Sequence, residues 1–137
     1  MTRASISVAT EAEAEDVAQR LVSFNREVAG PENVERIMLS LKEPNGRLVG
    51  GISAARSWDT LVIETLWVDD QIRGHHYGSL LLQESEHRGV EIGCKRAVLE
   101  TFSFQAEEFY ARHGYHTLSK IDGWPPSGHL SRMLKVL

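Results

Sequence analysis

Several common sequence features are missing from this chain of 137 residues, and each absence narrows the class of protein. The chain holds a single cysteine, Cys94, so it cannot form an intramolecular disulfide or a cysteine cluster for zinc. It has no run of about 18 apolar residues, the length that crosses a membrane as a helix, so we expect no membrane partner. No apolar signal-peptide core follows the N-terminus, which favours a cytoplasmic protein.

An excess of basic residues is also missing. Lysine and arginine together number 15 against 19 acidic residues, which gives a net charge of -4. Because nonspecific nucleic-acid binding depends on a basic face, we expect no nucleic-acid partner. The length is that of one domain, and no repeat, linker or low-complexity tract divides the chain. Residues 1–137 are therefore expected to form a single domain.

The first half of the chain has the periodicities of one helix and several strands. Residues 6–8 alternate and predict a short first strand. Apolar residues at helical spacing from Ala14 to Val28 predict a helix, which Gly30 and Pro31 end. Three strands of an antiparallel meander should follow, at residues 36–41, 48–55 and 61–68, with a tight hairpin at 44–46.

The second half alternates between strands and helices. A helix is expected from about Gly78 to Gly93, and a buried strand at 97–101 should lie parallel to strand 61–68 in a βαβ crossover. A short helix at 106–113 has acidic residues in its first turn and Gly114 after its last. Two final strands are expected at 115–121 and 130–136. The predicted order is β-α-β-β-β-α-β-α-β-β.

The loop between strand 61–68 and the next helix has the features of a phosphate-binding site. A helix N-terminus offers unpaired N–H groups and a partial positive charge to an anion. Gly74 and Gly78 let the backbone approach a bulky anion, and Arg73 adds a full charge. Taken alone, the loop is equally compatible with an ordinary turn between a strand and a helix.

Two segments together resemble the GNAT superfamily of N-acetyltransferases. Residues 73–79 (RGHHYGS) resemble its acyl-CoA signature, with Arg73 and Gly78 at the two ends and His76 where the middle glycine is usual. Residues 99–115 resemble the family's later strand and helix, although Ser103 stands at the usual asparagine. The matching positions in that second segment are Ala106, Phe109, Tyr110, Gly114 and Tyr115.

The resemblance implies both a fold and a reaction. The fold is α/β (α+β): a GNAT-like mixed, mostly antiparallel central sheet, with helices on both faces and a splayed parallel strand pair. The reaction is direct transfer of an acetyl group from acetyl-CoA to a primary amine in a ternary complex, without an acyl-enzyme on Cys94. The acceptor is a small molecule or a peptide amine, and a homodimer stays open. No metal is expected, because no pair of histidines has further ligands at suitable spacing.

The resemblance also assigns residues to coenzyme A. They come from the end of the strand before the loop, the loop itself, the position of the usual asparagine and one aromatic of the short helix. In order they are Leu66, Trp67, Val68, Arg73, Gly74, His75, His76, Tyr77, Gly78, Ser79, Ser103 and Phe109. A backbone N–H near residues 66–68 is expected to stabilise the oxyanion.

Two side chains are candidates for proton transfer. The resemblance implies that Tyr110 lies beside the sulfur of coenzyme A, where it is expected to protonate the departing thiolate, since a phenol holds its proton at neutral pH. Glu64 is the candidate base, because alternation places it on one side of its strand with Leu66 and Val68, and apolar neighbours raise the pKa of a carboxylate. Glu100 on the neighbouring strand competes for that role, and a water relay is a further route.

Two other functions stay open at this point. A noncatalytic acyl-CoA-binding regulatory module of the same fold is favoured by the departures at His76 and Ser103. A nucleotide-binding α/β domain is the second alternative, but the sequence has neither a Gly-x-Gly-x-x-Gly fingerprint nor a Walker lysine.

Overall fold

The computed structural model describes residues 2–137, and the chain divides into two compact units, Met1–Glu32 and Asn33–Leu137. The first unit contains helix α1 (Glu11–Ala29), which begins at a capping box. The Thr10 hydroxyl accepts from the Glu13 N–H, and the Glu13 carboxylate accepts from the Thr10 N–H. The predicted helix is confirmed.

The predicted strand at residues 6–8 is wrong. Residues 2–10 form no regular structure, and the side chains of Ile6 and Val8 are fully exposed. A strand is stable only when a neighbouring strand pairs with its backbone, and three alternating residues do not specify such a partner.

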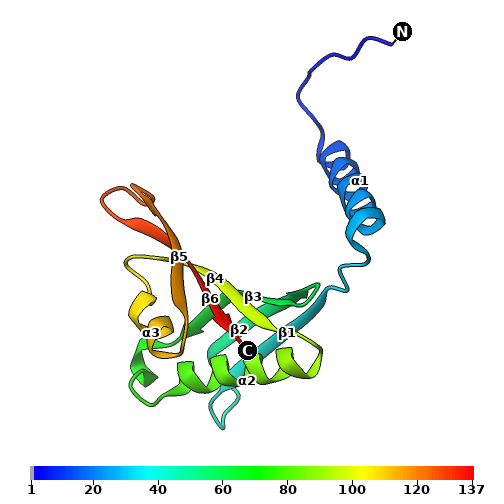
Figure 1. Ribbon diagram of the computed structural model, residues 1–137. Helices are drawn as coiled ribbons and strands as arrows, with labels where there is room; N and C mark the ends of the chain where they lie inside the picture. Colours follow the sequence, from blue (N-terminus) through cyan, green and yellow to red (C-terminus); the bar gives the residue numbers. More distant parts are fainter. Residues whose placement is uncertain (1) are drawn as a thin grey trace. The chain divides into compact units, whose positions relative to one another are not determined.

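The second unit is built on one six-stranded sheet with the strand order β1-β2-β3-β4-β6-β5 (Figure 1). Neighbouring strands are antiparallel except for β3 and β4, which are parallel. This confirms the predicted mixed, mostly antiparallel sheet. The strands are β1 (Glu35–Lys42), β2 (Leu48–Ser57), β3 (Thr60–Val68), β4 (Arg96–Phe102), β5 (His116–Asp122) and β6 (His129–Val136).

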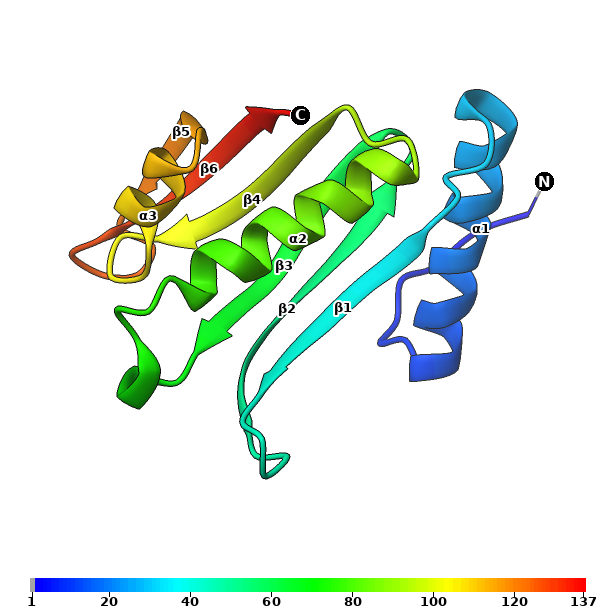
Figure 2. The same ribbon diagram turned by 90° about the horizontal axis from the view of Figure 1, so that it is seen from below.

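Two α-helices of this unit, α2 (Tyr77–Glu91) and α3 (Glu107–Arg112), cover the same face of the sheet (Figure 2). Their residues Leu82 and Tyr110 join one core cluster with Leu61 and Leu99 of the sheet. Helix α2 packs closely on β3, because a Cβ at Gly89 would lie only 3.1 Å from a methyl of Leu61. Since α1 belongs to the other unit, helices on both faces stay a prediction. None of the helices described in residues 2–137 is long and apolar enough to cross a bilayer.

The parallel pair is short and then opens. Strands β3 and β4 pair only at Thr60↔Arg96, Leu61↔Ala97 and Val62↔Val98. Beyond these positions β3 continues to Val68 and β4 to Phe102 without a shared ladder. The predicted splayed strand pair is therefore confirmed, and the opening between the two strands defines the candidate site.

Candidate functional site

A cavity of about 920 Å³ occupies the opening between β3 and β4. That volume suits a ligand of cofactor size. Its wall is formed by the end of β3, the loop that leads to α2, the first turn of α2, the end of β4 and one side of α3. The lining residues are Glu64, Thr65, Leu66, Trp67, Val68, Ile72, Arg73, Gly74, His76, Tyr77, Gly78, Ser79, Glu100, Thr101, Phe104, Gln105, Ala106, Phe109, Tyr110 and Arg112.

One end of the cavity is the N-terminus of α2. After β3 the chain forms a short 3-10 helix, η1 (Asp70–Ile72), whose cap Asp69 accepts from the Gln71 N–H at 2.9 Å. The Arg73 side chain then donates to the Val68 carbonyl at 3.0 Å, which holds the guanidinium beside the loop. Among the described residues, no side chain caps α2 at its N-cap residue, His76. The first N–H groups of α2 are therefore left for an anion.

His76 explains why a glycine is usual at its position in the signature. Its backbone has φ 64°, in the left-handed region that favours glycine. Gly78 is not required by steric crowding. A Cβ there would meet the ring of Phe109 at 3.5 Å, an ordinary contact distance. Packing within the protein thus leaves room for a side chain at Gly78. A glycine at this position instead keeps the backbone accessible from the cavity.

Tyr110 lines the cavity from α3. Its side chain is only 7% exposed, and its ring packs edge-on against Phe109 and Tyr115, with centroid distances of 5.2 and 5.8 Å. Burial raises the pKa of the Tyr110 phenol above its usual value. The hydroxyl is therefore fully protonated at neutral pH and is a competent proton donor.

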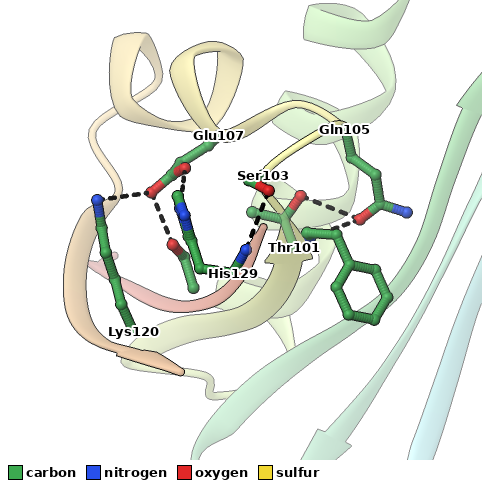
Figure 3. Close-up of polar contacts among 8 residues, drawn as sticks. Thr101, Ser103, Gln105, Glu107, Lys120 and His129 are labelled. Atoms are coloured by element: carbon green, nitrogen blue, oxygen red, sulfur yellow. Dashed lines mark hydrogen bonds and ion pairs between the residues drawn. The ribbon is translucent and has the colours of Figure 1, made fainter. Parts of the chain in front are cut away.

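The short helix α3 is fixed in place by polar contacts on both sides of its first turn (Figure 3). Glu107 accepts from the Ser131 hydroxyl at 2.6 Å, contacts His129 Nε2 at 2.9 Å and lies 3.7 Å from Lys120 Nζ. Hydrogen bonds from Ser131 and then His129 lower the pKa of Glu107. Gln105 accepts from the Phe102 N–H at 2.8 Å. Strands β5 and β6 thereby hold the helix that carries Tyr110.

Glu64 lies at the cavity, but not in the surroundings that alternation predicts. Ser53 pairs with Thr65 and Ala54 with Ile63, so Glu64 is the extra residue of a β-bulge. The bulge shifts the alternation, and Leu66 and Val68 pack against the core while Glu64 does not. Its side chain is 42% exposed and accepts from Arg36 Nη1 at 3.3 Å. The predicted common side and apolar neighbours of Glu64 are therefore wrong.

Glu100 faces the same cavity from β4. It is half-exposed and lies 3.7 Å from Arg132 on β6. Both candidate bases therefore border the cavity from opposite strands, and each has one arginine partner. The competition between Glu64 and Glu100 for the base stays open.

The structure brings most of the predicted coenzyme A residues to the cavity wall, but not His75 or Ser103. The Ser103 hydroxyl accepts from the His129 N–H at 3.1 Å, so it fixes the chain after β4 to the start of β6. Sequence reasoning missed Arg112 and Phe104, which also line the cavity. The position of Arg112 in the last turn of α3 already explained its positive charge, so the sequence carried no separate signal of a binding role. Phe104 lies outside every predicted element.

The arrangement can bind an anion at one end and move protons beyond it. Within the described part of the chain, the N–H groups of β3 that point toward β4 have no ladder partner after Val62, so they can stabilise a negative oxygen. Within residues 2–137, no cluster of three or more histidine, cysteine or acidic side chains is arranged to hold a metal ion.

Comparisons with known proteins agree with this geometry. The model of the Acetyltransferase (GNAT) family matches residues 5–115. The crystal structure of an acetyltransferase from Bacillus cereus ATCC 14579 is 31% identical, covers 98% of each chain and superposes with a TM-score of 0.93. Acetyltransferase Atu2258 from Agrobacterium fabrum is 25% identical over 85% of both chains.

A further relative is the Blasticidin-S acetyltransferase of Streptomyces morookaense. It is 40% identical over 82 residues, which make up 59% of this chain and 60% of that relative. The family match spans most of the chain, and the predicted fold and GNAT resemblance are confirmed. This chain belongs to the acetyltransferase (GNAT) family.

Proposed function

We propose that this protein transfers an acetyl group from acetyl-CoA to a primary amine. One observation carries the proposal. A single cavity contains both an uncapped helix N-terminus beside Arg73 and a buried, protonated phenol, that of Tyr110. The first is suited to a pyrophosphate, and the second to a departing thiolate.

The donor fits the α2 end of the cavity. Residues 73–79 would hold the pyrophosphate through the backbone N–H groups of α2 and the charge of Arg73. The opening between β3 and β4 would take the thioester arm toward Tyr110. Arg112, on the cavity side of α3, adds a second positive charge to the donor site.

The transfer then follows from the residues around the thioester. The amine loses a proton to Glu64, to Glu100 or to a water held by one of them, because only the neutral amine attacks the carbonyl. The C–N bond forms, and the unpaired β3 N–H groups stabilise the charged oxygen. The charged oxygen then re-forms the carbonyl, and the C–S bond breaks as the Tyr110 hydroxyl gives its proton to the thiolate. The nitrogen of the new amide gives up its second proton, which returns to the Tyr110 phenolate directly or through water.

A small-molecule amine is the acceptor that we propose. The name of the relative from Streptomyces morookaense supports this class, although the match covers only 60% of that relative. A peptide amine is the alternative. A cytoplasmic location and a homodimer stay predictions.

A screen for acetyl-CoA consumption over an amine library tests the proposal. Thiol release that depends on one or more amines, with a mass increase of one acetyl group on that amine, is the expected result. Binding of acetyl-CoA without turnover of any amine would favour a noncatalytic acyl-CoA-binding module. A thermal shift with ATP or NAD, but none with acetyl-CoA, would favour a nucleotide-binding domain.

A further inference from the structure

We infer that the part of the cavity bordered by Glu100 and Phe104 binds a planar, positively charged group of the acceptor. The site consists of the Glu100 carboxylate and three neighbouring aromatic rings, those of Phe102, Phe104 and Trp124. The inference deepens the proposed function and rests on it, since it names the chemistry of the acceptor.

The three rings form a continuous and accessible cluster. Phe104 stacks on Phe102 with centroids 5.6 Å apart and planes at 7°, and its side chain is 71% exposed. Trp124, between β5 and β6, meets Phe102 edge-on at 5.9 Å and is 52% exposed. Because Phe104 also lines the cavity, the cluster extends the cavity wall. Exposed aromatic surface of this kind next to a cavity is typical of a ligand-binding surface.

Glu100 supplies the charge beside these rings. Leu99 and Thr101 are buried, so Glu100 and Phe102 point to the opposite face of β4, two residues apart and on the same side. Glu64 adds a second carboxylate from across the opening. The arginine partners of the two acids, Arg132 and Arg36, are not part of the cavity wall. Two carboxylates therefore border the opening between β3 and β4.

A planar cation satisfies both features at once. A planar group can stack on the exposed face of Phe104. If that group is positively charged, it also gains a cation–π attraction from the aromatic face. An amidinium or guanidinium also matches a carboxylate such as Glu100 with two parallel N–H donors. The α2 end disfavours the same group, because Arg73 and the helix N-terminus are positive there.

The test uses benzamidine, a planar cation, and benzamide, its neutral counterpart of nearly the same shape. Binding of each to the protein saturated with coenzyme A is measured by calorimetry. We expect benzamidine to bind at least about tenfold more tightly than benzamide. Glu100→Gln should remove most of that difference, and Phe104→Ala should weaken both probes. Glu91→Gln, which removes an exposed carboxylate at the far end of α2, is the matched control and should retain the preference.

Three results overturn the inference: equal affinities for the two probes, a preference for benzamidine that survives Glu100→Gln, or unchanged affinities of both probes in Phe104→Ala. Melting temperatures of the variants show whether each has folded. The proposed function is tested separately by acetyl-CoA consumption. Acetyl transfer without a preference for benzamidine refutes only the acceptor site. A preference for benzamidine without acetyl transfer to any amine refutes the proposed reaction and leaves a binding site for planar cations.

Discussion

The two ends of the cavity are built from different parts of the polypeptide. At the α2 end the proposed binding groups are mainly backbone N–H groups, placed by the helix start at Tyr77 and left accessible by Gly78. At the other end they are side chains, with Glu100 and Phe104 as the chief examples. Backbone groups follow from the fold, whereas side chains change with single substitutions. The donor site therefore depends mainly on the fold, whereas the acceptor site depends on particular side chains.

Tyr110 also lines the cavity, and its hydroxyl should give the largest effect. Tyr110→Phe keeps the ring, so packing against Phe109 and Tyr115 is retained. We expect kcat to fall by roughly 10² to 10⁴ with acetyl-CoA affinity near that of the wild type. Steady-state kinetics and calorimetry on the same variant measure both quantities.

Tyr115→Phe is the matched control for Tyr110→Phe. The Tyr115 hydroxyl donates to the buried Glu86 at 2.7 Å, and Glu86 also accepts from Lys135. Loss of a hydrogen bond to a charged group should lower the free energy of unfolding by about 1.5–3 kcal/mol. Tyr115→Phe is thus expected to lose stability rather than kcat. If Tyr110→Phe loses stability and keeps its kcat, Tyr110 is only a packing residue.

At the backbone-built end, Gly78→Glu should weaken acetyl-CoA binding at least roughly tenfold, about 1.4 kcal/mol. The added carboxylate opposes both the helix dipole and the donor's phosphates. Gly78→Ala is the matched control, since its Cβ would meet Phe109 at an ordinary 3.5 Å. It should lose much less affinity. Equal losses in the two variants would mean that bulk, and not charge near a phosphate, explains the effect.

At the side-chain-built end, Glu64→Gln should lower kcat/KM by about tenfold and remove the acidic limb of its pH profile. The exposed position of Glu64 at a bulge leaves room for water to replace part of its role, so the effect is smaller than at Tyr110. Glu100→Gln is the parallel variant. If only Glu100→Gln removes the acidic limb, the base is on β4.

The smallest effect should come from Glu107, which anchors α3. Its pKa is lowered in the folded protein, so its contribution to stability is present above the pKa of an unfolded glutamate, about 4.3. That contribution is lost as the pH falls through the lower, folded value. Glu107→Gln should therefore reduce the melting temperature by a few degrees near pH 7 and flatten its decline in acid. Melting curves from pH 3 to 7 measure this, and an unchanged acid decline would rule out Glu107 as a source.

The contrast between the two ends also explains what could be predicted from the sequence. The order of strand β3, polar loop and helix α2 was predictable because each has its own sequence pattern, with glycines in the loop between two apolar periodic segments. Phosphate binding by that loop stays a prediction. The side chosen for Glu64 was wrong because the bulge opposite Ser53 and Ala54 has no local sequence signal. Phe102, Phe104 and Trp124 come from separate segments, and only the folded chain brings them together.

A crystal structure of the complex with coenzyme A tests the central claim most directly. The account predicts a pyrophosphate against the backbone of residues 73–79 and a sulfur between β3 and β4, within hydrogen-bonding reach of the Tyr110 hydroxyl. Coenzyme A bound outside this opening, or a sulfur far from Tyr110, would contradict it.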